Sequence, residues 1–225
     1  MGGQACVFYG GAEFSRDADF VLLADGGNLA RLRRALTDLQ AEPIAVPPFE
    51  LKHLRRGHAL HFRCWHPDAL RMRVDVMSKM HGVAAFPTLW KRRTTIELPD
   101  GTRCNLLSLP DLVQAKKTQR DKDWPMIRRL VEAHYFASYT RPRLSQVMFW
   151  LGELRTPQLL VELAQARPRL ACRFASRRPL LCHAITGRLE RLEAALAEEE
   201  KRLRTADKAY WLPLRQELER LRHPR

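Results

Sequence analysis

The sequence lacks several features that would assign it to a membrane, secreted or zinc-binding class. It contains no run of about 18 uncharged apolar residues, so no membrane-spanning helix is expected. The first residues are not a basic segment followed by an apolar stretch, so no secretory signal is expected. The 5 cysteines are scattered and include no C-x-x-C pair, which argues against a disulfide framework or a zinc knuckle. These absences predict free thiols in a reducing, cytoplasmic environment.

Acidic residues are also in short supply. The 225 residues include 39 Lys or Arg and 25 Asp or Glu, which gives a net charge of +14 at pH 7. The excess is spread over residues 1–140 and 141–225, so it is not a detachable basic tail. Such a charge favours a polyanionic partner, and the solvated surface of an arginine-rich protein is the alternative. The apolar fraction of 45% is sufficient for a folded core.

The first 137 residues contain the signals of a mixed fold of strands and helices. An apolar run precedes a turn and an amphipathic helix, two segments then alternate as half-buried strands do, and a hairpin leads into two helices. The residue ranges are 20–24 for the apolar strand, 29–39 for the helix, 58–65 and 70–77 for the alternating strands, 94–98 and 103–107 for the hairpin, and 109–120 and 124–136 for the last helices. This order predicts an α+β core domain over residues 1–137.

Residues 138–225 contain no strand signal and have helical periodicity. Apolar residues recur at spacings of three and four from Ile185 to Leu203, and again from Tyr210 to Leu221. Two such rows predict a helical C-terminal region that ends in a helical hairpin. A seam between two copies of the chain is the alternative, so the sequence leaves open a monomer and a homodimer.

Two aspartates precede the apolar run at residues 20–24. In a strand, residues two apart point to the same face, so Asp17 and Asp19 present their carboxylates side by side. Two such charges repel unless a cation lies between them, and Mg²⁺ is a hard cation that prefers oxygen ligands. Asp75 lies on the polar face of another predicted strand and completes a set for two metal ions if the strands are neighbours. The alternative is that these are surface residues, with Asp75 paired to Arg73 or Arg71.

The segment GGQACVFYGGAEFSRDADFVLL resembles the signature of the nucleotidyltransferase superfamily that includes DNA polymerase beta and the kanamycin nucleotidyltransferases. In that signature a glycine pair is followed by an aspartate, an apolar residue and a second acid, and a third acid lies on a later strand. The segment LLSLPDLVQAKKTQRDKDWPMIRRLVE is similar to a helix pair of small bacterial members, among them toxin-like abortive-infection nucleotidyltransferases. The resemblance covers residues 1 to about 135.

The resemblance implies a mixed sheet and a Mg²⁺-dependent transfer of a nucleoside monophosphate from a nucleoside triphosphate to an acceptor hydroxyl. Asp17, Asp19 and Asp75 would bind two Mg²⁺ ions and act as the catalytic set. The residues implied in nucleotide binding are Gly2, Gly3, Ser15, Arg16, Lys116 and Arg120. The basic helical region favours RNA, including tRNA, as acceptor, and a protein or an aminoglycoside stays open.

One departure from the family bears on activity. In the family a strand upstream delivers the glycine pair, whereas here Gly2 directly follows Met1. Either the chain starts further upstream or this strand is absent, and the activity of the chain depends on which holds. The competing interpretation is therefore a catalytically inactive protein of the same fold that binds nucleotide, RNA or a partner such as a cognate antitoxin.

Two further clusters have less distinctive patterns. Four histidines and Cys64 lie between residues 53 and 66, but strand alternation places His58 and Cys64 opposite His61. They cannot converge on one metal without a bulge. Residues 167–178 are rich in arginine, with Phe174 among them, and this stretch would bind nucleic acid or form an exposed helix surface.

Overall fold

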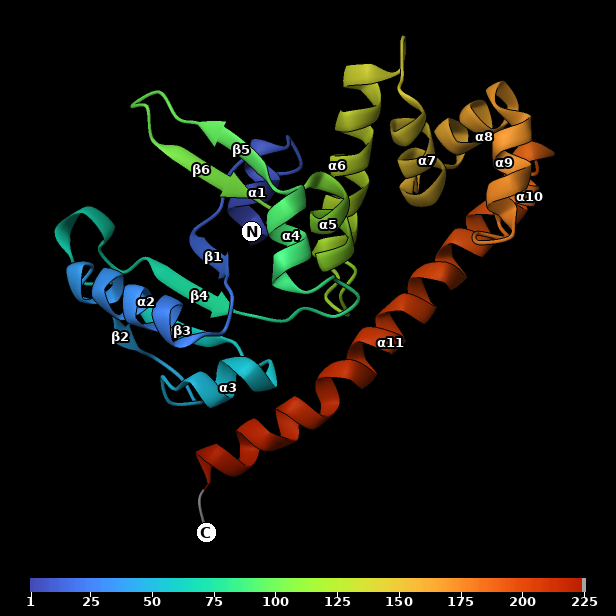
Figure 1. Cartoon of the computed structure of the whole chain (residues 1–225). Helices are drawn as coiled ribbons and strands as arrows, with labels where there is room; N and C mark the ends of the chain where they lie inside the picture. Colours follow the sequence, from blue (N-terminus) through green and yellow to red (C-terminus); the bar gives the residue numbers. More distant parts are fainter. Residues whose placement is uncertain (224–225) are drawn as a thin grey trace. The chain divides into compact units, whose positions relative to one another are not determined.

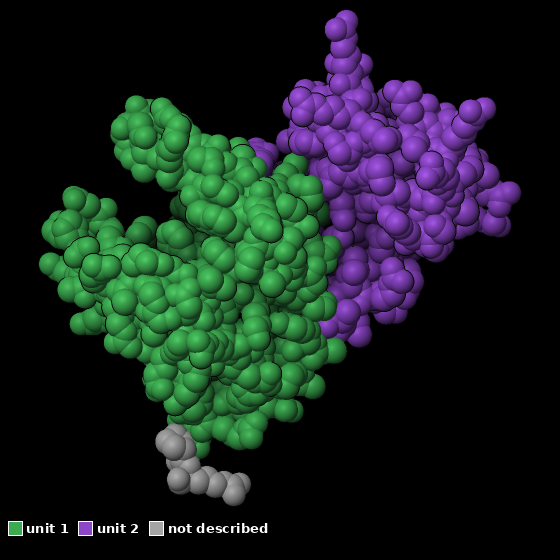
Figure 2. Space-filling view, viewed as in Figure 1, with its two compact units in different colours: residues 1–8, 12–115, 209–225 green, residues 9–11, 116–208 purple. Residues whose placement is uncertain are grey.

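The structure, a computed structural model, describes residues 1–223 and belongs to the mixed α+β class. Contacts within the chain divide it into two compact units (Figure 2). The first unit contains residues 1–8, 12–115 and those from 209 onward, and the second contains residues 9–11 and 116–208. These bounds differ from the expected division after residue 137, because the helix that ends at residue 138 belongs to the second unit.

The first unit is built around a four-stranded sheet with the strand order β1-β4-β3-β2 (Figure 1). β1 runs parallel to β4, whereas β3 is antiparallel to β4 and to β2, so the sheet is mixed. The strands are β1 (Asp17–Val21), β2 (Glu42–Pro43), β3 (Leu60–Arg63) and β4 (Arg73–Met77). A parallel pair requires a long crossover, and this one contains helices α2 (Gly26–Asp38) and α3 (Leu51–Arg56) and the 3₁₀ turn Pro67–Ala69.

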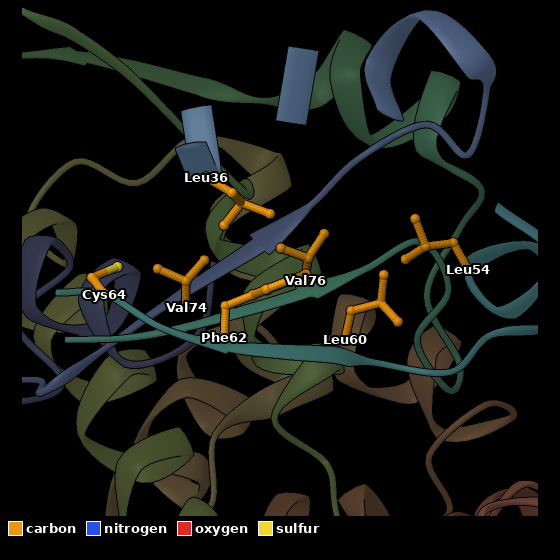
Figure 3. Packing of buried hydrophobic residues seen from close by; sticks show 7 residues of the cluster. All are labelled: Leu36, Leu54, Leu60, Phe62, Cys64, Val74 and Val76. Carbon is orange, nitrogen blue, oxygen red and sulfur yellow. The ribbon is translucent and has the colours of Figure 1, made fainter. Parts of the chain in front are cut away.

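One face of this sheet forms the core of the first unit. The alternation predicted for residues 58–65 and 70–77 is confirmed, because the apolar members of β3 and β4 are buried under α2 and α3 (Figure 3). The cluster consists of Leu36, Leu54, Leu60, Phe62, Cys64, Val74 and Val76. Burial of each large apolar side chain stabilises the fold by about 1.5–3 kcal/mol. The side chains between these positions are directed to the opposite face of the sheet.

Helix α2 follows β1 after a short turn and confirms the predicted helix. Asp25 caps it, with Oδ1 accepting a hydrogen bond from the Asn28 amide at 2.7 Å. Leu29, Leu32 and Leu36 lie on the face that packs on the core cluster. This packing fixes where β1 ends, and therefore where the residues of β1 lie along β4.

The rest of the first unit contains a second, two-stranded sheet and four helical segments. The predicted hairpin is confirmed as β5 (Thr94–Glu97) paired antiparallel with β6 (Arg103–Leu106). Gly101 occupies the turn with a φ angle of +82°, which glycine adopts without strain. The helices of this unit outside the crossover are α1 (Gly2–Phe8), α4 (Phe86–Arg92) and α5 (Leu109–Ala115), with the end of α11.

The second unit is helical. Its elements are α6 (Asp123–Ser138), α7 (Leu144–Glu153), α8 (Pro157–Ala166), α9 (Pro168–Ala175), α10 (Leu181–Ile185) and the first part of α11 (Leu189–Arg222). Trp150, Leu160 and Leu181 are among the fully buried side chains of its core. Within residues 1–223, no helix combines the length and the apolar character needed to cross a membrane.

The expected helical hairpin at the end of the chain is wrong. Residues 189–222 form one continuous helix, α11, which continues through Pro213. The two apolar rows pack in different units: Leu192 and Leu196 are buried in the second unit, and Leu214 is buried in the first. The shift between the rows marks a change of packing partner, and the residues between them, RTADKA, include no glycine, proline or asparagine that would favour a turn.

Candidate functional site

Polar side chains gather on the face of the sheet opposite the core cluster. In the β1–β4 register Asp17 is the partner of Arg73, and Asp19 is the partner of Asp75. On the other side of β4, His61 of β3 is the partner of Asp75. Partners across neighbouring strands share a face, as do residues two apart in one strand. The three aspartates predicted from the sequence therefore lie on one face, together with Arg73 and His61. We call these five residues the polar sheet face.

Asp75 is at the centre of the hydrogen bonds on this face. Its Oδ1 accepts a hydrogen bond from Arg73 Nε at 2.7 Å and lies 2.8 Å from Nδ1 of His61. Burial acts to raise the pKa of Asp75, but the hydrogen bonds and the charges of His61 and Arg73 outweigh it and hold this pKa below its ordinary value. Asp75 is therefore ionised at neutral pH.

Arg73 supplies the positive charge on the polar sheet face. Its hydrogen bond to Asp75 raises the pKa of the guanidinium, burial opposes this, and the charges of Asp75, Asp17 and Asp19 add to the increase. Arg73 Nη2 also lies 3.1 Å from Nδ1 of His61. One guanidinium thus balances three carboxylates, so the pairing of Asp75 with Arg73 that the sequence left as an alternative is present.

The carboxylates match Mg²⁺ in chemical type, since Mg²⁺ prefers oxygen ligands and near-octahedral geometry. Among residues 1–223, however, no three His, Cys, Asp or Glu side chains are gathered closely enough to hold a metal ion together. Oδ1 of Asp75 is engaged by both Arg73 and His61. The aspartates therefore suit a metal ion in their oxygen ligands and in lying on one face of the sheet. In the structure, Arg73 is the cation that balances their charge.

The predicted glycine pair packs directly on the first strand. A Cβ atom on Gly2 would lie 1.8 Å from Oδ2 of Asp19, and Gly2 has a φ angle of +64°. A Cβ atom on Gly3 would lie 2.3 Å from Oγ of Ser15. The Gly3 amide donates a hydrogen bond to Oδ2 of Asp19 at 3.3 Å. Only glycine allows such a close approach of the backbone to the carboxylate.

The two residues before the first aspartate have different environments. Ser15 is half-buried, and its hydroxyl donates a hydrogen bond to the carbonyl oxygen of Asp17 at 3.1 Å. Arg16 is exposed, with its guanidinium 5.8 Å from the centre of the Phe14 ring. Ser15 therefore holds the start of β1 in place, whereas Arg16 points into solvent.

The predicted phosphate-binding residues Lys116 and Arg120 belong to the second unit. Lys116 is buried and its Nζ lies 3.3 Å from Oδ1 of Asp123. Arg120 Nε donates a hydrogen bond to Oδ2 of the same carboxylate at 2.8 Å. Burial acts to raise the pKa of Asp123, but the charges of Lys116 and Arg120 and the hydrogen bonds of Thr118 and Arg120 hold it below its ordinary value. In the structure these cations neutralise a buried aspartate.

His61 is the site residue that the sequence reasoning missed. The sequence suggests His61 only as a metal ligand beside His58 and Cys64. The structure places those two residues elsewhere: Cys64 is in the core cluster, and His58 Nε2 lies 2.9 Å from Oε2 of Glu217. A signal was present, because His61 lies on the polar face of one predicted strand and Asp75 on the polar face of the next. An antiparallel pairing of these two strands brings them together.

The comparisons with known proteins add no relative to this description. No protein-family model matches the chain, and no curated protein matches it. The geometry of the polar sheet face and the resemblance of the sequence motifs are therefore the features that bear on function.

Proposed function

We propose that the protein is a Mg²⁺-dependent nucleotidyltransferase that moves a nucleoside monophosphate from a nucleoside triphosphate to an acceptor hydroxyl. The observation that carries this proposal is the register of β1 and β4, in which Asp19 lies opposite Asp75 with Asp17 on the same face. The close packing of Gly2 against Asp19 supports it, because the glycine pair of the resembling signature meets the acidic pair.

In the proposed reaction the acceptor oxygen forms a bond to the α-phosphorus, and the bond from that phosphorus to pyrophosphate breaks. Asp17, Asp19 and Asp75 would hold two Mg²⁺ ions, which when bound supply charge neutralisation and orientation for such in-line displacements. Asp75 is ionised at neutral pH, so it is able to accept a hydrogen bond from the acceptor hydroxyl. The Gly3 amide holds the carboxylate of Asp19 in a fixed orientation.

Arg73 is expected to change partners in this reaction. It neutralises the aspartates in the structure, and a guanidinium binds phosphate oxygens at least as readily as carboxylates. Release of Asp75 by Arg73 would free an oxygen of Asp75 for a metal ion and bring a cation toward the triphosphate. Lys116 and Arg120 stay a prediction as nucleotide-binding residues, since their donors serve Asp123.

A second candidate is a catalytically inactive protein that binds nucleotide, RNA or a cognate antitoxin. Two observations favour it: Arg73 and His61 both engage Oδ1 of Asp75, and no metal-holding group of side chains is found among residues 1–223. RNA, including tRNA, is the favoured acceptor or ligand in both cases because of the net charge of +14. A cytoplasmic location belongs to the same proposal and accords with the five free cysteines.

Turnover distinguishes the two candidates. The protein is incubated with each nucleoside triphosphate labelled at the α-phosphate, with Mg²⁺ and with total cellular RNA, and labelled RNA and protein are separated by electrophoresis. We expect label on a macromolecule with the wild type, and a fall to background with Asp17→Asn and with Asp19→Asn. Asp68→Asn is the matched control, because the Asp68 side chain is 92% exposed and lies outside the polar sheet face. Label that persists in the Asp19 variant, or absence of label with the wild type, would contradict the proposed transfer.

A further inference from the structure

The positive charge is not shared evenly between the two units. The second unit contains 20 Lys or Arg against 11 Asp or Glu, whereas the first contains 19 against 14. The second unit is also the smaller one, so its excess of basic residues is larger both in number and in density. A polyanionic partner is therefore more strongly attracted to the second unit.

Several acidic residues of the second unit pair with cations in its interior. Asp123 neutralises Lys116, and Glu153 lies 2.8 Å from Nζ of Lys117. Glu199 accepts hydrogen bonds from the buried Arg155 and Arg178. The cations that these carboxylates offset are buried or half-buried, so these carboxylates do not offset the arginines on the surface.

The segment between Glu162 and Glu190 contains six arginines and no acidic residue. Helix α9 lies within this segment and packs against α7, α8 and α10. Arg178 is the buried member of the six, and it is bound by Glu199. The exposed members in and beside α9 are Arg167, Arg169, Arg173 and Arg177. We call these four residues the arginine face.

Helical periodicity separates the arginine face from the packed side of α9. Residues four apart lie on the same side of a helix, about 6 Å apart along its axis, so Arg169 and Arg173 lie together, with Arg177 in the turn after the helix. The opposite side contains Ala171, which is fully buried, and Phe174, which contacts Gly152. None of the four arginines makes an ion pair with an acidic side chain of residues 1–223.

We propose that the arginine face binds the phosphodiester backbone of RNA. Each guanidinium offers several N–H donors in a planar fork that matches two phosphate oxygens, and it keeps its charge at every relevant pH. The aromatic ring of α9, that of Phe174, is turned to the packed side, so base stacking is not available there. The binding is therefore driven by phosphate charge and is independent of sequence.

The position of the arginine face does not depend on the proposed transfer. The choice of RNA over other polyanions, however, rests on the proposed function. Binding and transfer are separated by measuring binding without nucleoside triphosphate and without Mg²⁺. A protein that binds RNA but transfers nothing would retain this inference and lose the proposed function. If the protein transfers to RNA but binds RNA equally well without the arginine face, the proposed function is retained and this inference is lost.

The test is fluorescence anisotropy of a labelled RNA hairpin titrated with the full chain over a range of salt concentrations. The variant carries Arg169→Gln, Arg173→Gln and Arg177→Gln together. We expect its affinity to fall about tenfold or more at moderate salt, and the slope of log affinity against log salt to decrease by about 2 to 3. Circular dichroism checks the fold, which these exposed substitutions should leave intact.

The matched control removes the same number of charges elsewhere, with Arg34→Gln, Lys91→Gln and Arg129→Gln, which are all exposed. We expect the control to bind RNA nearly as the wild type does. Equal weakening in the control would show that net charge alone is responsible and would overturn the inference. It would also be overturned if the wild type failed to bind RNA, or if vesicles of anionic lipid competed with the hairpin at equal phosphate concentration.

Discussion

The polar sheet face of the first unit and the buried ion pairs of the second use the same side-chain types in different surroundings. On the sheet, the Arg73 side chain is 41% exposed, contacts Asp75 and feels the charges of Asp17 and Asp19 as well. In the helical unit Arg155 and Arg178, with side chains 7% and 5% exposed, surround one carboxylate, Glu199. The first arrangement leaves negative charge in excess near solvent, where a cation has access to it. The second is closed, and its excess of positive charge is held by backbone oxygens.

Those backbone contacts indicate a structural role for the second arrangement. Arg178 Nη1 donates to the carbonyl oxygen of Leu151 at 2.9 Å, and Arg155 Nη2 donates to that of Leu196 at 3.0 Å. The Arg155 guanidinium also lies 4.7 Å from the centre of the Trp124 ring. The ion pairs thus join α11 to the other helices of the unit. The comparison predicts that substitutions in the helical unit affect stability and that those on the sheet affect function.

The largest stability effect is expected for Glu199→Gln. It leaves two buried guanidinium groups without a counter-charge, and removing one partner of a buried pair typically costs about 3–5 kcal/mol. Urea denaturation followed by tryptophan fluorescence measures the change. Glu198→Gln is the control, since Glu198 is exposed and its loss should change the free energy of unfolding by less than about 0.5 kcal/mol.

Asp75→Asn provides the contrast on the sheet. Its partner Arg73 reaches solvent, so the loss of the pair should cost no more than about 1 kcal/mol. If Asp75→Asn destabilised the protein as strongly as Glu199→Gln, the distinction between an accessible face and a closed cluster would not hold.

An effect on stability between those of Glu199→Gln and Asp75→Asn, with a large effect on transfer, is expected for Gly2→Ala. The new Cβ atom would meet the carboxylate of Asp19, and alanine is strained at a φ angle of +64°. We expect a cost of about 1–3 kcal/mol together with loss of transfer, because Asp19 must move. The control is Gly26→Ala, where a Cβ atom would have no neighbour within 4 Å, and its stability should equal or exceed that of the wild type. Wild-type transfer in Gly2→Ala would contradict a role for this contact.

Much of the polar sheet face could be predicted from the sequence, because it depends on patterns within short segments. A period of two in residues 58–65 and 70–77 predicts which side of each strand is buried and places Asp75 on a polar face. Asp17 and Asp19 are predicted to share a face because they are two residues apart in a strand. The strand order and the register are set by long-range pairing, so the contact of His61 with Asp75 followed only from the structure. Loop chemistry was equally local, as the hairpin at residues 94–107 shows.

Less of the second unit could be predicted from the sequence, because charge alone does not distinguish a buried cation from an exposed one. Lys116, which the sequence predicts to bind phosphate, is buried beside Asp123, and a buried charge must be paired. The shift between the two apolar rows predicts a turn, whereas the structure has one helix, α11, that belongs to both units. The sequence does not show that two units share one helix. Helical periodicity identifies a face, but the partner of that face is set by tertiary contacts.

The dependence of stability on pH offers a further way to sharpen the comparison. Burial acts to raise the pKa of Glu199, but Arg178 and Arg155 hold it below the ordinary value of 4.5. A carboxylate with a lowered pKa in the folded state stabilises the protein above its ordinary pKa, and this contribution is lost as the pH falls through the folded-state pKa. The free energy of unfolding should therefore decrease as the pH falls below about 4.5. Glu199→Gln should show a smaller decrease, and an unchanged pH dependence in that variant would contradict the assignment.

The smallest effect on stability, and the sharpest test of the polar sheet face, is expected for Arg73→Gln. Because Arg73 is partly exposed, its loss should cost less than about 1 kcal/mol without Mg²⁺. The aspartates then lose their balancing cation, so Mg²⁺ should bind more tightly and raise the unfolding midpoint more than in the wild type. Arg34→Gln is the control, since Arg34 is exposed on α2, and α2 packs on the opposite face of the sheet. An equal response to Mg²⁺ in the wild type and in both variants would mean that the guanidinium does not compete with a metal ion. The three carboxylates would then be explained by their pairing with Arg73 and His61 alone.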